Sequence, residues 1–542
     1  MRSFPESLAW IWAGLLLLAV LAHGGAVRGE FHFDDSHTIE LNPAVKSVSR
    51  IPHIWRDVST SSAIPENRIY RPLTFTAFNL LWASGDGSPV PFFLFKLLLH
   101  ASVAFLLGLI WLELFARAAP QYAKSHRERA AWAIAALFAA HPACSEIVNY
   151  VSSTTSLLAA FFYSIAFLLF IRGKTLISIV AYAASALSKE EGITLPAVLV
   201  LHQLVFASEG LRPGEAIARA LRRAAPWIVA GIALAALVVG MMPHTLKESR
   251  GTLSPMLYFF TQWRAYLHYF GLSFVPAPLN ADHVSFGFAQ GFLEVPVVLS
   301  LAGNLALLGL AWACRRRARA FTFGLLWFYV ALAPASSVVP LAEPVNEHRM
   351  YLGYVGWFGA VGGLVLFIAE EALRLKPAWK WIRASLAAVL AVFCVLSQAR
   401  AYVWNDRERL WTDTLRKNPT NGRALNNLAL IRIRQARFPE ALVLLGRCEE
   451  VWPVYVYCAI NKGIALAELG RLDDAERSYR RAIDLRFARA YSSFYYAKFL
   501  EEKRGNAKEA ARLYRHTLDV SGGTFDEARV RLERLRRSDP SL

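Results

Sequence analysis

The chain has 542 residues, of which 55% are hydrophobic and only 18% are charged, and its mean hydropathy is +0.33. Its apolar runs are too long and too many for a water-soluble core, so the composition predicts a protein that crosses a membrane many times. The formal net charge of +18 does not indicate nucleic-acid binding, because the cytoplasmic loops of membrane proteins are rich in Lys and Arg.

The first apolar segment, residues 8 to 28, follows Arg2 and has the features of a membrane helix and of a signal peptide. Because many more apolar segments follow, we predict an uncleaved signal anchor. Two adjacent carboxylates, Asp34 and Asp35, come soon after it in the stretch RGEFHFDDSHTIELNP. The sequence leaves open whether one of them caps a helix near Thr38 or both belong to a functional site.

Eleven further apolar segments follow in chain order, at residues 92 to 116, 129 to 142, 153 to 171, 175 to 188, 192 to 207, 227 to 242, 256 to 276, 292 to 313, 321 to 339, 350 to 369 and 384 to 400. The segment at 256 to 276 contains Gln262, Arg264 and His268, which are costly in contact with lipid. Its membrane crossing is therefore in question.

The distribution of Lys and Arg residues between the loops indicates whether the segment at 256 to 276 crosses the membrane. If 256 to 276 does not cross and the N-terminus lies inside, the inside loops carry eighteen Lys and Arg residues, whereas the short outside loops carry four, Lys189, Lys247, Arg250 and Arg349. If 256 to 276 crosses, the inside loops and the short outside loops carry eleven Lys and Arg residues each. The positive-inside rule therefore favours eleven crossings, an interfacial or re-entrant helix at 256 to 276, and an outside C-terminus.

The predicted fold is all-α, with a polytopic membrane core at residues 1 to 402 and a polar tail at 403 to 542. The core includes a long outside loop at 29 to 91. In the tail, residues 427 to 441 and 461 to 475 match at a period of 34, and a third unit ends at Ala510. Small residues recur at Ala429, Gly463 and Ala497, where paired helices need close contact. The period predicts tetratricopeptide (TPR) repeats, which bind extended peptides or partner proteins.

The five cysteines have no metal-ligand spacing, and three of them lie in or beside apolar segments. The sequence leaves open whether Cys448 and Cys458 pair. It implies neither a zinc site nor a disulfide framework.

Many polar residues fall on the predicted outer face, although the charge count used neither carboxylates nor histidines. Asp34 and Asp35 are joined there by Arg71, His141, Glu146, Lys189, Glu190, Glu191, Asp282, His283, Glu347, His348 and Arg349. A carboxylate base beside cations that hold a phosphate is typical of transfer from a phosphate leaving group. Each residue alone also has a structural interpretation, such as a helix end at His141 or a snorkelling Arg349.

The ordered motifs resemble a known family. An acidic pair after the first span, IYRPLTFTAFNLLW, FKLLLHASVAFLL, HPACSEIVNYVSSTTSLLAAFF, LSKEEGITLPAVLVL, Asp282-His283 and VNEHRMYLG, followed by TPRs, resemble the transmembrane-and-TPR proteins known as TMTC and their bacterial relatives. The resemblance covers nearly the whole chain.

This resemblance implies a GT-C-type glycosyltransferase that uses a sugar on a polyprenyl phosphate and inverts the sugar carbon. Asp34 or Asp35 would then be the base that activates a Ser or Thr hydroxyl of a protein acceptor, and we expect Asp34 to be the base with Asp35 in support. A helix at 256 to 276 would place Arg264 and His268 beside the donor phosphate. The sequence decides neither the sugar nor the need for a divalent metal.

Two other functions remain open. A transporter or flippase for lipid-linked saccharides needs polar groups through the bilayer and often inverted repeats, and neither is evident here. A membrane-anchored TPR scaffold needs only one or two spans. The lack of an Asn-X-Ser/Thr sequon and the Ala- and Arg-rich composition favour a bacterial inner membrane, with the site and TPRs in the periplasm, over the endoplasmic reticulum with a luminal site.

Overall fold

The computed structural model describes residues 6–64, 67–242, 254–337, 339–341, 343–368, 379–486, 488–523 and 525–542. Lys247, Arg250 and part of the inside loop at 374 to 383, which entered the charge count, lie outside these residues. The chain divides into a membrane unit, Met1–Asp406, and a tail unit, Arg407–Leu542. Both units are helical throughout the described regions, so the predicted all-α class is confirmed.

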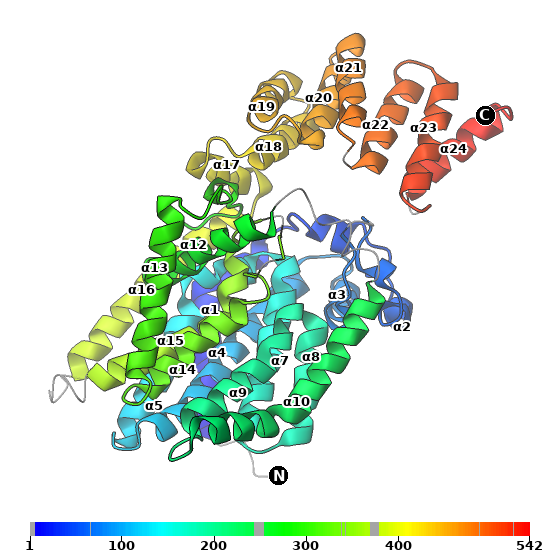
Figure 1. Ribbon diagram of the computed structural model, residues 1–542. Coiled ribbons are helices and arrows are strands. Elements are labelled where there is room, and N and C mark those ends of the chain that lie inside the picture. The colour runs from blue at the N-terminus through cyan, green and yellow to red at the C-terminus, as the bar shows by residue number, and fades with distance from the viewer. Residues whose placement is uncertain are drawn as a thin grey trace. The chain divides into compact units, whose positions relative to one another are not determined.

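The membrane unit contains a helix in each of the twelve predicted apolar segments. Its helices are α1 (Glu6–His23), α2 (Ile51–Ile54), α3 (Pro72–Gly85), α4 (Val90–Ala118), α5 (Lys124–Ala140), α6 (Ser145–Asn149), α7 (Thr154–Ile171), α8 (Thr175–Ser188), α9 (Leu195–Phe206), α10 (Pro213–Met241), α12 (Pro255–Phe274), α13 (Val295–Cys314), α14 (Arg319–Leu332), α15 (Tyr351–Phe367) and α16 (Trp379–Trp404) (Figure 1).

Seven stretches of the described chain are long and apolar enough to cross a membrane, and they contain α1, α4, α7, α10, α13, α15 and α16. The helix α5 and the short helical segment Pro142–Asn149 pass the same test only as a pair, which is bent by 55° at the break and is either a broken span or a re-entrant loop. Two shorter apolar helices, α8 and α14, lie within the same unit. The helix α12 is not among the seven, and the count of eleven crossings stays a prediction.

Close packing of α4 against α15 depends on a glycine. Trp111 of α4 is fully buried, and its Nε1 donates a hydrogen bond to the carbonyl oxygen of Val355 in α15, 2.8 Å away. A Cβ atom at Gly359 would lie 1.6 Å from the Trp111 ring. The absence of a side chain at Gly359 therefore allows α15 to approach α4.

The tail unit is a series of antiparallel helix pairs. It contains α17 (Arg407–Lys417), α18 (Gly422–Arg434), α19 (Phe438–Val451), α20 (Val456–Glu468), α21 (Leu472–Asp484), α22 (Arg489–Glu502), α23 (Ala507–Val520) and α24 (Asp526–Ser538). The pairs are α18 with α19, α20 with α21, and α22 with α23. The small residues predicted at the contacts, Ala429, Gly463 and Ala497, are all buried.

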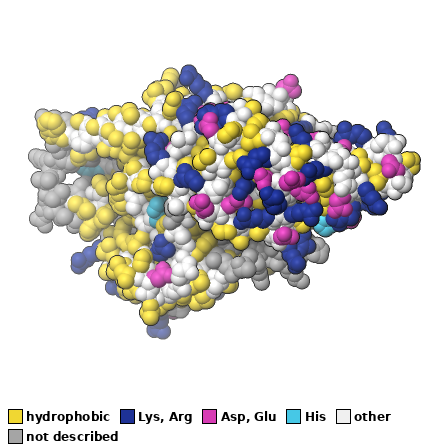
Figure 2. All heavy atoms as spheres, turned by 90° about the horizontal axis from the view of Figure 1, so that it is seen from above, with side chains coloured by type: hydrophobic (Ala, Val, Ile, Leu, Met, Phe, Trp, Pro, Cys, Tyr) yellow, Lys and Arg dark blue, Asp and Glu magenta, His cyan; other side chains and the backbone are white. Residues whose placement is uncertain are grey.

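The surface of the tail unit is polar, and its interior carries one cross-link. Figure 2 shows Lys and Arg side chains mixed with Asp and Glu side chains over the tail helices, whereas apolar side chains dominate the visible membrane unit. Cys448 of α19 and Cys458 of α20 form a disulfide, with their Cα atoms 6.2 Å apart. This bond joins the first helix pair to the second. The other three cysteines of the chain are free.

Candidate active site

The two aspartates lie in a compact turn of residues 31–41, which we call the acidic loop. It follows the 3-10 turn Gly24–Arg28 and includes the helical turn Ser36–Glu40. The carbonyl oxygen of Asp34 accepts hydrogen bonds from the amides of His37 and Thr38, at 3.1 and 2.9 Å. This local bonding fixes the backbone, while the two carboxylates end in different surroundings.

Asp35 is fully buried and bonded to two parts of the chain. Its carboxylate accepts hydrogen bonds from the amide of His32 at 2.9 Å, and from the amide of Ser152 at 2.7 Å and its hydroxyl. Burial raises the pKa of the Asp35 carboxyl, and the bonds from His32 and Ser152 act in the opposite direction. No side-chain capping bond forms at Asp35, so the capping interpretation is wrong for this residue. Asp35 instead anchors the acidic loop.

Asp34 has the opposite environment, because 65% of its side chain is exposed. Its Oδ1 lies 3.3 Å from Nε2 of His37, and its amide donates to the hydroxyl of Tyr150 at 3.3 Å. Nδ1 of His37 lies 2.9 Å from the Ser62 hydroxyl, so the outer loop holds the imidazole. Asp34 is therefore the more exposed of the two aspartates.

Phe33 precedes Asp34 in a backbone conformation that bulky residues rarely adopt. Its φ is 48°, in the left-handed region. Its ring packs against those of Tyr150 and Trp404, at centroid distances of 5.5 and 6.0 Å. Such strain persists where the surrounding structure enforces it, and here the aromatic contacts do so.

Residues 150–156, which we call the serine turn, connect several parts of the site. The turn contacts Asp34 through Tyr150 and Asp35 through Ser152. The hydroxyl of Ser156 accepts a hydrogen bond from Nζ of Lys189 at 2.6 Å. The acidic loop and the loop after α8 therefore meet at the start of α7.

Glu146 and His348 form a second pair beside the serine turn. Nδ1 of His348 lies 2.7 Å from Oε1 of Glu146, and the His348 amide donates to Oε2 at 3.2 Å. The imidazole lies next to Tyr150, at a centroid distance of 6.3 Å. Its Nε2 has no hydrogen-bond partner among the described residues. A carboxylate that orients one imidazole nitrogen leaves the other for a substrate.

His283 and Glu347 form a related pair, with His283 Nε2 at 3.1 Å from Glu347 Oε1. The same oxygen accepts the amide of Asn280 at 2.6 Å. Asp282 is buried and accepts the amide of Val284 at 3.2 Å. The two predicted motifs, Asp282-His283 and the one around Glu347, are therefore in direct contact.

The helix α12 places Arg264 and His268 one turn apart. The Arg264 guanidinium donates to the carbonyl oxygen of Phe286 at 2.8 Å and lies over the Phe286 ring. The imidazole of His268 lies 5.4 Å from that of His283, measured between ring centroids. Burial and the neighbouring His283 lower the pKa of His268 to about 4, so His268 is neutral at pH 7. Of the two, only Arg264 brings a positive charge.

Arg71 pairs with a predicted site residue. Its guanidinium forms a two-point ion pair with Glu190, at 2.9 and 2.5 Å. Partial loss of hydration raises the pKa of Glu190, but the Arg71 charge outweighs this effect and lowers the pKa to about 2. Glu190 is therefore ionised at any physiological pH.

Lys189 and Arg349 also contact other groups of the protein. Nζ of Lys189 lies 3.0 Å from a Glu191 carboxylate oxygen, and Arg349 donates to the carbonyl oxygen of Glu343 at 2.9 Å. With Arg71 and Arg264, all four predicted cations thus have protein partners. An anionic substrate would have to share or displace them.

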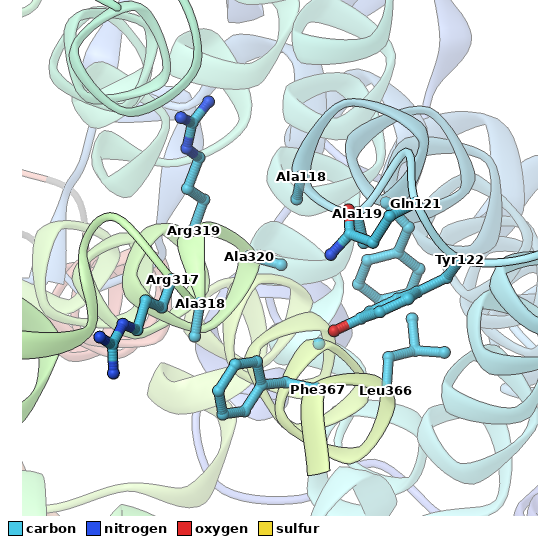
Figure 3. Close-up of a pocket in the computed structure, with 12 residues that line it drawn as sticks. Ala118, Ala119, Gln121, Tyr122, Arg317, Ala318, Arg319, Ala320, Leu366 and Phe367 are labelled. Atoms are coloured by element: carbon cyan, nitrogen blue, oxygen red, sulfur yellow. The ribbon is translucent and has the colours of Figure 1, made fainter. Parts of the chain in front are cut away.

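His141 and the pocket in Figure 3 belong to other parts of the fold. His141 ends α5, is buried, and its Nε2 lies 3.1 Å from the Ser273 carbonyl oxygen, consistent with the predicted helix end. The pocket lies at the Ala118 end of α4, where Tyr122 faces the segment of Arg317 and Arg319 (Figure 3). Because α4 has 29 residues, and so is about 43 Å long, this pocket is far from the acidic loop, which packs at the Phe92 end.

Three residues that sequence patterns did not select also take part in the site. Lys96 of α4 is fully buried and contacts the serine turn. Arg400 and Trp404 of α16 lie on the other side, where Arg400 interacts electrostatically with Glu146 and Trp404 stacks on Tyr150. Lys96 and Arg400 lie within or at the end of apolar segments, where a charged side chain is costly. Their presence in these segments is the sequence feature that could have identified them as site residues.

The site therefore combines an exposed carboxylate, Asp34, with an oriented imidazole, His348, around Tyr150. This arrangement suits removal of a proton from a hydroxyl and binding of an anionic group. Among the described residues, no group of three or more His, Cys, Asp or Glu side chains is placed to hold a metal ion.

Comparison with known proteins identifies similar sequences. The chain is 30% identical to protein O-mannosyl-transferase TMTC4 of Homo sapiens over 209 residues, which is 34% of this chain and 28% of that protein. It is 22% identical to TMTC3 of Mus musculus over 553 residues, covering 90% of this chain and 58% of the relative. It is 25% identical to Tmtc3 of Drosophila melanogaster, covering 77% of this chain and 52% of that relative.

These relatives are longer than the chain, which matches between 28% and 58% of the length of those compared here. No family model matches the chain. The matches to TMTC3 extend through both units. The predicted resemblance to the TMTC proteins is thereby confirmed.

Proposed function

We propose that the chain is an integral-membrane, inverting GT-C-type glycosyltransferase. It moves a hexose, in the first instance mannose, from a polyprenyl-phosphate donor to a Ser or Thr hydroxyl of a protein. The reaction takes place at the extracytoplasmic face, and the TPRs bind the acceptor. The relatives' names, protein O-mannosyl-transferase, support the reaction class and the sugar.

The observation that carries the proposal is the contrast between the two aspartates. Asp35 is buried and holds the acidic loop, whereas the Asp34 carboxylate is 65% exposed. In the proposed step Asp34 takes the proton of the acceptor hydroxyl, and the hydroxyl oxygen bonds to the anomeric carbon. The bond from that carbon to the donor phosphate breaks, and polyprenyl phosphate leaves with the electron pair.

His348 is the proposed contact for the donor phosphate. Glu146 fixes its Nδ1, and the imidazole lies beside the Tyr150 ring, which leaves Nε2 as the nitrogen for the phosphate. Arg264 and Arg349 contribute positive potential from α12 and the segment before α15. The polyprenyl chain would lie among the membrane helices, because its hydrocarbon belongs in the bilayer.

The cross-link in the tail supports the extracytoplasmic side. Disulfides form and persist in oxidising compartments, and the Cys448–Cys458 bond lies within the tail unit. Together with the charge count, this favours a periplasmic tail on a bacterial inner membrane, or a luminal tail in the endoplasmic reticulum. Protease accessibility of the tail in spheroplasts tests this placement.

The enzymatic test uses the full chain in proteoliposomes with polyprenyl-phosphate mannose and a Ser/Thr-rich peptide. Asp34→Asn is expected to lower the rate of transfer by about 100-fold or more, because a general base supplies that much. Asp57→Asn, in the same outer loop, is the matched control and should retain activity. Full activity in D34N refutes the role of Asp34, and lipid translocation without transfer favours the flippase function.

A further inference from the structure

Lys96 is a buried basic residue that the proposed transfer step does not use. It lies in α4 with no exposed surface. Its ammonium group donates to the carbonyl oxygens of Tyr150 and Val151, the latter at 3.4 Å, and to the hydroxyl of Ser153 at 3.0 Å. Burying a charge costs several kcal/mol or more unless it is paired and bonded, so these contacts need an explanation beyond packing.

The partner charge comes from the acidic loop. Asp35 attracts Lys96 electrostatically and also accepts the amide and hydroxyl of Ser152. Lys96 therefore holds the carbonyl side of the serine turn, while Asp35 holds its amide side. Glu146, on α6, is the second carboxylate that attracts Lys96.

Asp34 depends on this arrangement through Tyr150. The Asp34 amide donates to the Tyr150 hydroxyl, and Lys96 binds the Tyr150 carbonyl oxygen. His348 also packs against the Tyr150 ring. A shift of the serine turn would therefore move the proposed base, whereas Glu146 still holds the proposed phosphate contact through the amide and Nδ1 of His348.

We propose that Lys96 is a positioning residue for the transfer reaction, which acts by clamping the serine turn between its ammonium group and the Asp35 carboxylate. It touches neither substrate nor sugar. The proposal rests on the proposed function for its kinetic consequence, but its structural consequence is independent of that function.

The test compares Lys96→Met, Asp35→Asn and the double variant in the full chain. Displacing a catalytic group by about 1 Å can cost about 100-fold in rate, so K96M is expected to lower kcat by about 10- to 100-fold. The KM for the donor should change less than about twofold, because Lys96 does not bind it. Lys124→Met is the matched control, since Lys124 is 82% exposed on α5.

Hydrogen exchange supplies a readout that does not require activity. In K96M, peptides covering residues 31–36 and 150–153 should exchange faster, because they contain the amides of His32, Asp34 and Ser152 that the clamp protects. K124M should leave their exchange unchanged. If K96M does not fold, Lys96→Gln, which keeps a hydrogen-bond donor without the charge, takes its place.

The outcomes separate the two proposals. Losses in kcat that are no greater in K96M/D35N than in either single variant support the clamp, and losses that multiply overturn it. Unchanged exchange in both segments also overturns it. If the wild-type protein transfers no sugar, the proposed function fails, while the exchange data still decide the role of Lys96.

Discussion

Nδ1 of His348 lies 2.7 Å from Oε1 of Glu146, although 202 residues separate them in the sequence. Glu146→Gln keeps the size of the side chain but removes the negative charge that Nδ1 of His348 contacts. Because charge-assisted hydrogen bonds contribute about 1.5–3 kcal/mol, we expect the donor KM to rise about tenfold or more. Initial rates at varied donor concentration measure this effect.

The control for that experiment is Glu113→Gln, since Glu113 pairs with Arg172 near the far end of α4. E113Q should leave the donor KM unchanged. His348→Ala should resemble E146Q, and the double variant should be little worse than H348A. A normal KM in both single variants would contradict the proposed phosphate contact.

The crossing of α15 over α4 predicts a large stability effect for Gly359→Ala. The added methyl group would fall within the Trp111 ring, and Trp111 is fully buried and cannot swing away. Overpacking of this kind costs about 1–3 kcal/mol, and more where the backbone must move. Thermal unfolding in detergent should therefore show a lower Tm for G359A. Gly14→Ala, on α1, has nothing within 4 Å of the new atom and should match the wild type.

The Arg71–Glu190 pair predicts a stability difference that depends on pH. The pKa of Glu190 is lowered to about 2 in the folded protein, so the pair stabilises the fold above the unfolded-state pKa of about 4.3 and loses this contribution as pH falls toward 2. The Glu190 side chain is 59% exposed, so solvent limits the effect to about 1 kcal/mol or less. Glu190→Gln should lower Tm at pH 7 and have little effect near pH 2. An equal difference at both pH values would exclude the ion pair as its cause.

The cross-link of the tail predicts a thiol count that depends on reduction. Alkylation of the denatured, non-reduced chain should label three cysteines, and prior reduction should raise the number to five, as mass spectrometry would show. Replacing Cys448 and Cys458 with Ser should lower the free energy of unfolding of the tail by about 2–3 kcal/mol. Five labelled cysteines without reduction would contradict the pairing.

The sequence predicted the helices of the membrane unit well, because long apolar runs admit only one secondary structure in a bilayer. It also separated the roles of Asp34 and Asp35 in part, although Asp35 binds Ser152 instead of capping a helix. It did not predict that Arg71, Lys189 and Arg349 pair with neighbouring carboxylates and carbonyls, because such pairs form between segments whose spacing carries no periodic signal. The sequence did not identify Lys96 as a site residue, because the surrounding residues FKLLLH have the pattern of an ordinary apolar helix.

The serine turn has a further consequence for how the protein matures. Residues of the turn contact Asp35, Lys96 and Lys189, which lie 117, 54 and 33 positions away in the sequence. Glu146, four residues before the turn, contacts His348, which is 202 positions further along the chain. During synthesis these partners enter the bilayer one after another. The proposed site is therefore incomplete until the chain has been synthesised past residue 348, and we expect intermediates that end before His348 to transfer no sugar.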